Sequence, residues 1–74
     1  MTSETTKLFK LGKNIQRIRK EKGLSQNQLA EILNISRKHL AKLETAKRRI
    51  SLKLLFKLAE KLDIKEKTLF DFDK

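Results

Sequence analysis

One stretch of twenty residues, 26–45, restricts the possible folds of this 74-residue chain more than any other. Apolar residues recur at helical spacing in both of its halves: Leu29, Ala30, Leu33, Leu40 and Leu43. A three-residue break, Asn34 to Ser36, separates the halves. We therefore predict two short helices, residues 26–33 and 37–44, that cross at a steep angle because their connection is so short. Ala30 is placed where only a small side chain fits between them.

The residues around this break suit helix ends. Asn34 can end the first helix because Asn, after Gly, best tolerates the left-handed backbone found there. The side chain of Ile35 is expected to anchor the turn by packing into the core. Ser36 can accept a hydrogen bond from the free backbone N–H groups of the second helix as its N-cap, worth roughly 1 kcal/mol, and Ser25 can do the same for the first helix. Local chemistry therefore specifies both helix starts.

The rest of the sequence predicts three further helices after a disordered tail over residues 1–5. By apolar spacing and stop signals they run from Thr6 or Leu11 to Lys22, from the N-cap Ser51 to about Leu62, and from about Glu66 to Phe70. Gly23 is the expected C-terminal stop of the first of these. We therefore expect an all-α fold, a compact five-helix bundle forming one domain over residues 6–72.

The net charge of +10 is large for this length and points to a polyanionic partner. Taken alone, the charge fits a solvated, lysine-rich surface equally well. Lys53, Lys57 and Lys61, spaced four residues apart, are interpreted as such a solvated face. The helix pair favours the first reading, because a helix that is basic on one side and apolar on the other suits the major groove of DNA.

Composition also excludes several classes of protein. The chain has no Cys, which rules out a disulfide scaffold and thiolate metal sites, and we expect no metal and no cofactor. No apolar run approaches the roughly 20 residues that span a bilayer, and the polar start MTSETT does not resemble a signal peptide. A cytoplasmic location is expected. The carboxylates and the single His show neither metal-ligand spacing nor a sheltered acid–base pair, so we do not expect an enzyme.

Helical geometry selects the side chains that face outward from residues 37–44. Leu40 and Leu43 define the buried side of this helix. Successive side chains are about 100° apart around a helix, so those that point most directly away from the core are Lys38, Lys42 and Thr45. Arg37 and Ala41 lie beside them. These residues are the candidates for reading DNA bases.

The run GLSQNQLAEILNISRKHLAKLE resembles the Cro and Xre class of helix-turn-helix regulators, the phage-repressor type. The similarity extends from about Leu11 to Phe70, nearly the whole chain. It implies a lambda-repressor-like bundle that binds double-stranded DNA in the major groove, and it places Arg37, Lys38 and Lys42 at the base-contacting positions. The alternative is that these three residues contact only phosphates. Because Arg and Lys favour the O6 and N7 acceptors of guanine, we expect a half-site that contains G.

The chain departs from this family after the second helix of the pair. Family members often have Asn-Gly, a basic residue and then Pro-Ser there, whereas this chain reads TAKRRIS over residues 45–51. The missing Gly and Pro leave the conformation of this loop open. Its Arg-Ile-Ser-Leu sequence is similar to that of the controller proteins of restriction–modification systems, a branch of the same class.

The resemblance also implies contacts with the phosphate backbone of DNA. Gln26 opens the first helix of the pair, where the free N–H groups and the positive dipole end favour an anion, and Asn27 is a weaker neighbour. Lys47, Arg48 and Arg49 follow the second helix and are expected to straddle the phosphates at the groove edge. The alternative for these three is a solvated basic loop.

Two residues lie on the flanks of the second helix. His39 is interpreted as a phosphate or base-edge contact, with a plain flank residue as the alternative. Glu44 puts a negative charge beside the surface that faces DNA, which argues for an internal partner. We predict a structural pair with Arg19, which the family resemblance supports; removing one partner of such a buried pair is costly.

Several apolar residues remain once the core is assigned, and the family often dimerises through its fourth and fifth helices. We predict a homodimer whose interface contains Leu54, Phe56, Leu69, Phe70 and Phe72. A two-fold dimer would place its two recognition helices roughly 34 Å apart, on successive major grooves. The alternative is that these residues only cover the small core.

Together these features predict a sequence-specific transcriptional regulator, a repressor acting on an inverted-repeat operator. Two rivals stay open. One is an antitoxin or controller protein of the same fold that also binds a protein partner such as a toxin. The other is a basic amphipathic protein that binds RNA or an anionic membrane surface, which predicts binding without preference for duplex DNA.

Overall fold

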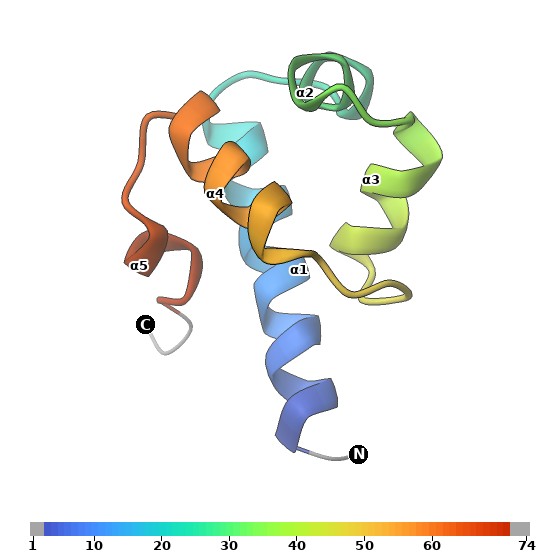
Figure 1. Ribbon diagram of the computed structural model, residues 1–74, viewed down its shortest axis with the longest axis vertical. Coiled ribbons are helices and arrows are strands. Elements are labelled where there is room, and N and C mark those ends of the chain that lie inside the picture. Colours follow the sequence, from blue (N-terminus) through green and yellow to red (C-terminus); the bar gives the residue numbers. More distant parts are fainter. Residues whose placement is uncertain (1–2, 72–74) are drawn as a thin grey trace.

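Residues 3–71 are described by a computed structural model, in which the regular elements are all α-helices (Figure 1). In chain order they are α1 (Ser3–Glu21), α2 (Gln26–Leu33), α3 (Arg37–Glu44), α4 (Leu52–Lys61) and α5 (Glu66–Leu69). The prediction of an all-α, five-helix bundle is confirmed for this part of the chain. The predicted bounds of α2 and α3 agree with the structure.

The first helix begins earlier than predicted. Residues 3–5 form the first turn of α1, so the prediction of a disordered tail is wrong for them; Met1 and Thr2 lie outside the described residues. No Gly or Pro interrupts the chain before Leu11. Glu4 adds a negative charge to the first turn, where the helix dipole favours it.

Left-handed residues end four of the helices, with Ala46 (φ 60°) following α3. Gly23 (φ 74°) follows α1, Asn34 (φ 59°) follows α2, and Asp63 (φ 55°) follows α4. In each case a backbone N–H one residue further on bonds back to the last helical turn, as in Ile35 N to Ala30 O at 3.0 Å. Asn34 therefore takes the conformation that the sequence predicts for it.

The core runs through all five helices. Its fully buried side chains include Ile15, Leu29, Leu33, Leu40, Leu58 and Leu69. Ala30 is 3% exposed and belongs to the same cluster, against which Ile35 packs. The core therefore follows the apolar spacing of the sequence, but it also takes in Leu69, which we predicted at a dimer interface.

Helix α1 lies between α3 and α5 (Figure 1) and contacts both of them. Helix α2 contacts α3 and α4, and α4 in turn contacts α5. The buried amide of Asn14 fastens α5, because its Nδ2 donates to Leu69 O at 2.8 Å and to Thr68 O at 3.2 Å. This arrangement leaves the outer face of α3 uncovered.

Candidate nucleic-acid interface

Helix α3 is fixed at its start and along its inner face. Ser36 is its N-cap, and the Ser36 Oγ accepts from His39 N at 2.9 Å. Leu40, Leu43 and Glu44 are buried against α1 and α2. Because both the start and the inner face are fixed, the rotation of α3 about its axis is fixed as well.

The outer face of α3 presents cations to solvent. Arg37, Lys38 and Lys42 are all exposed, whereas His39 and Ala41 are half-buried at its edges. Thr45 follows the helix, and its hydroxyl donates to Ala41 O at 2.8 Å. The structure therefore brings the three predicted base-reading cations together on one uncovered surface.

The start of α2 is specified by a capping box. Ser25 Oγ accepts from Gln28 N at 3.1 Å, and Gln28 Oε1 accepts from Ser25 N at 2.8 Å. This exchange satisfies the third N–H of the helix and leaves those of Gln26 and Asn27 at the positive end of the helix dipole. The two predicted phosphate contacts of α2 therefore lie where an anion is favoured.

A buried carboxylate joins three helices behind this surface. Glu44 of α3 is 4% exposed, and its Oε2 accepts from Arg19 Nε of α1 at 2.7 Å. Arg19 also donates to the backbone oxygen of Leu24 at 2.8 Å. Arg19 and Glu44, which the sequence analysis paired, thus form a buried ion pair.

The same carboxylate also orients Gln26. Glu44 Oε1 accepts from Gln26 Nε2 at 2.9 Å, a contact that sequence reasoning did not find. A side chain predicted to touch phosphate is therefore held by the ion pair between α1 and α3. Residues 26 and 44 are far apart in the sequence, so no local pattern signals their bond.

Gly12 permits the close approach of α1 and α3. A Cβ on Gly12 would lie 2.6 Å from Glu44 O and 2.7 Å from Leu43 O, nearer than side-chain carbons are found. Sequence reasoning missed this contact. The available signal was a lone Gly inside a helical pattern, which often has a packing reason.

The loop after α3 is closed by backbone bonds despite lacking the family's Gly. Lys47 N donates to Lys42 O at 2.8 Å, and Ala46 N donates to Leu43 O at 3.3 Å, the pattern of a Schellman C-cap. Ala46 takes φ 60° to make this turn. Such a conformation costs a residue with a Cβ about 1–2 kcal/mol.

The three cations of this loop, Lys47, Arg48 and Arg49, are exposed. Arg49 Nη2 lies 3.0 Å from Glu4 Oε2 of α1, and both side chains are mostly exposed. Sequence reasoning missed this ion pair because it assigned Glu4 to a tail. To bind a phosphate, Arg49 must break its ion pair with Glu4. The cost is small, because exposed ion pairs contribute only about 0–1 kcal/mol.

His39 lies beside cations. Burial, together with the positive charges of Arg48 and Lys42, lowers the pKa of His39 below its ordinary value of 6.5. The imidazole is therefore neutral at pH 7 and gains its charge only in more acidic solution. The charges of α3 and of the loop after it thus both act on His39.

The residues predicted at a dimer interface divide into four groups. Phe56 and Phe70 are 53% and 46% exposed, as an interface requires. Leu54 is half-buried against the core. Leu69 has no exposed surface, so its assignment to the interface is wrong: it packs inside its own chain. Phe72 lies outside the described residues.

Residues 3–71 contain neither a metal-ligand cluster nor a membrane-spanning helix. No group of three or more His, Cys, Asp or Glu side chains could hold a metal ion. No helix in this range is long and apolar enough to cross a membrane.

The chain is similar to known proteins in both sequence and structure. The family model HTH_3, described as helix-turn-helix, matches residues 15–69. An HTH-type transcriptional regulator of Rickettsia conorii is 45% identical over 53 residues, which cover 72% of this chain and 42% of the relative. The chain therefore spans less than half the length of the curated relatives it matches.

Two solved structures are similar over most of the chain. The restriction–modification controller protein C.AhdI from Aeromonas hydrophila has a TM-score of 0.81 and 38% identity, covering 85% of this chain and 96% of that one. SinR, a master regulator for biofilm formation crystallised in complex with DNA, has a TM-score of 0.75 and 34% identity, covering 82% of this chain and 98% of that one.

Proposed function

The chain belongs to the helix-turn-helix family HTH_3, the Cro and Xre type of transcriptional regulators and not of enzymes, and on that premise we propose that it represses transcription as a homodimer on inverted-repeat DNA. The family resemblance seen in the sequence is thereby confirmed. One observation carries the proposal: α3 is locked from behind by buried residues and presents Arg37, Lys38 and Lys42 on an uncovered face. A bound dimer would repress by occupying promoter DNA.

Base recognition is assigned to α3. Lys38 and Lys42 lie one helical turn apart on its outer face, and Arg37 stands at its N-terminal end. Guanidinium and ammonium groups donate to guanine O6 and N7, which are accessible in the major groove. The preferred half-site therefore contains guanine, and His39 at the edge of the helix contacts a base edge or an adjacent phosphate.

Phosphate binding is assigned to the two ends of the helix pair. Gln26 and Asn27 offer backbone N–H groups at the start of α2. Lys47, Arg48 and Arg49 offer side-chain charges in the loop after α3. These contacts carry no sequence information, but they set affinity and its dependence on salt.

Selection of bound duplexes from a random pool tests the assignment. We expect the native chain to enrich an inverted repeat with half-site centres about one helical turn apart. Lys38→Ala should change the enriched sequence, and Lys47→Ala should weaken binding uniformly. Lys61→Ala, which removes the same charge from an exposed position on α4, is the control. A pool with no enriched sequence would overturn the proposal.

The dimer is supported by the exposed aromatic rings of Phe56 and Phe70. Phe56→Glu should shift the chain from dimer to monomer in sedimentation equilibrium without changing its helical circular dichroism. Ile32→Glu is the matched control, because Ile32 is also an exposed apolar residue (39%) but lies on α2. A native chain that is monomeric both free and on DNA would refute the dimer.

The similarity to C.AhdI supports a second candidate, a controller protein for restriction–modification genes. A promoter–reporter assay separates the two functions. The selected site is placed either across the promoter or upstream of it, and expression is measured with and without the protein. Repression at the first site alone supports a simple repressor, whereas activation from the upstream site supports a controller.

A further inference from the structure

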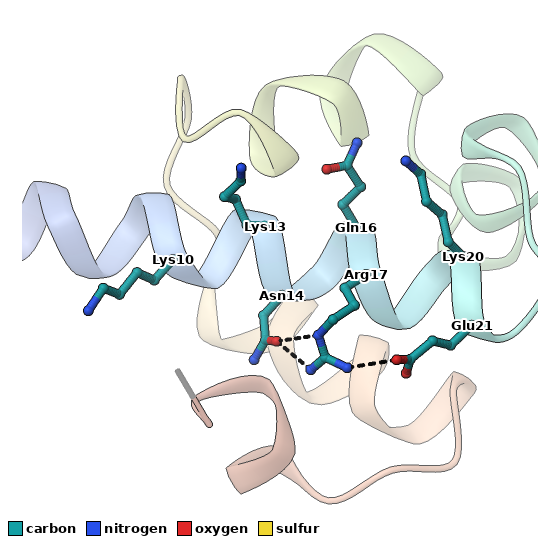
Figure 2. A pocket seen from close by; sticks show the side chains of 7 residues that line it. All are labelled: Lys10, Lys13, Asn14, Gln16, Arg17, Lys20 and Glu21. Atoms are coloured by element: carbon teal, nitrogen blue, oxygen red, sulfur yellow. Dashed lines mark hydrogen bonds and ion pairs between the residues drawn. The ribbon is translucent and has the colours of Figure 1, made fainter. Parts of the chain in front are cut away.

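The outer surface of α1 carries a row of donors that the proposed function does not use. Lys13, Gln16 and Lys20 are spaced three and four residues apart, so they share one side of the helix. Figure 2 shows their side chains projecting toward α3, whereas Arg17 and Glu21 point the opposite way. All five border an open hollow of about 680 Å³.

The positive charge of this row is not neutralised by any carboxylate within residues 3–71. Arg17, on the other side of the hollow, forms an ion pair in which its Nη1 donates to Glu21 Oε2 at 2.9 Å. Lys13 and Lys20 are exposed, and no carboxylate in the described part of the chain pairs with either. Lys13 Nζ stands 5.4 Å from the centre of the Phe9 ring, which leaves its charge in place. The row therefore suits an anionic partner.

The row lies next to the DNA-binding elements. Gly12, next to Lys13, touches the backbone at the end of α3. Lys20 lies in the last turn of α1, close to the start of α2 at Gln26. The row on α1 therefore borders the surface that the proposed function places against DNA.

We propose that Lys13, Gln16 and Lys20 bind phosphates of the operator that flank the half-site read by α3, on the strand that passes the start of α2. The inference rests on the proposed function, because it needs DNA docked on α3. Seven residues of helix separate the two lysines by about 10 Å, enough to follow more than one phosphate. The row thus lengthens the DNA footprint beyond the bases that are recognised.

Two duplexes and two double variants test this inference. The short duplex ends at the selected operator, and the long one adds about one helical turn of arbitrary sequence on each side. Lys13→Gln with Lys20→Gln removes the row's charge. Lys53→Gln with Lys61→Gln is the control, because it removes the same charge from exposed positions on α4. Affinity is measured by titration over a range of salt concentrations.

We expect the native chain to bind the long duplex more tightly and with a steeper salt dependence. The α1 variant should lose this advantage, with its salt slope on the long duplex reduced by about 2, while its affinity for the short duplex stays near that of the control. Equal losses on both duplexes, or an equal effect of the α4 control, would overturn the inference. Absence of any specific binding by the native chain would instead refute the proposed function.

Discussion

Gln26 Nε2 donates to Glu44 Oε1 at 2.9 Å, so the first side chain of α2 is held by the carboxylate that ends α3. The other oxygen of this carboxylate accepts from Arg19 of α1 at 2.7 Å. One buried charge therefore sets the relative positions of the three helices that carry the proposed DNA contacts. A fault in this network would disturb both stability and DNA binding.

Glu44→Gln should strongly destabilise the chain. The substitution leaves the buried Arg19 guanidinium without a charge partner, which costs about 3–5 kcal/mol of unfolding free energy. Urea denaturation followed by circular dichroism measures the loss. Glu21→Gln makes the same change in the exposed pair with Arg17 and should cost less than about 0.5 kcal/mol. Similar losses in the two variants would contradict the role of burial.

Gly12→Ala should destabilise the chain by about 1–3 kcal/mol, because the added methyl group would press on the backbone of Leu43 and Glu44 and force α1 away from α3. The same change in an unpacked helix would be stabilising by about 1 kcal/mol. The sign of the shift in urea midpoint therefore decides whether the two helices touch here. A more stable variant would contradict the close contact.

Ala46→Gly should stabilise the chain by roughly 0.5–1 kcal/mol. It relieves the left-handed backbone at φ 60°, and glycine's greater freedom in the unfolded chain offsets part of the gain. Ala41→Gly, within α3, is the matched control and should be destabilising by about 1 kcal/mol. Thermal unfolding measures both. A loss of stability in Ala46→Gly would mean that this position is not strained.

His39 should give stability and DNA affinity opposite responses to acid. Its pKa is lowered by burial and by Arg48 and Lys42, so as the pH falls below 6.5 the unfolded chain takes up the proton first and the free energy of unfolding decreases. Above pH 6.5 this loss is absent, and the free energy of unfolding keeps its full value. If His39 meets phosphate, binding favours its charged form, and DNA affinity should rise over the same window.

The measurements are urea denaturation and DNA titration between about pH 7.5 and pH 5, compared with His39→Gln. The variant should lack both trends. If native and variant chains show the same dependence of affinity on pH, His39 does not meet a phosphate or a base edge.

How far sequence could predict this molecule depended on how local each feature is. Ser25, Asn34 and Ser36 act on neighbouring backbone groups, so the bounds of α2 and α3 followed from the sequence. The cations on the outer face of α3 followed from the spacing of Leu40 and Leu43. The pair of Arg19 and Glu44 was accessible because a carboxylate beside a basic surface needs a partner.

The features that sequence missed join residues that are distant along the chain. The early start of α1 was missed because its first turn has no apolar repeat, and the ion pair of Glu4 with Arg49 went with it. Leu69 was placed at an interface because it was among the apolar residues left over once the core was assigned. The bonds from Asn14 to the backbone of α5 bury it instead.

The sequence by itself determined that the chain forms a helix-turn-helix with a basic outer face, because caps, turns and helical spacing act over a few residues. Only the tertiary structure decided how that unit is held. The Gln26–Glu44 bond, the approach of α3 to Gly12 and the place of the α1 lysine row beside the DNA-binding elements depend on how whole helices pack. Packing is set by the combined shapes of all the elements, and no single stretch of sequence encodes it.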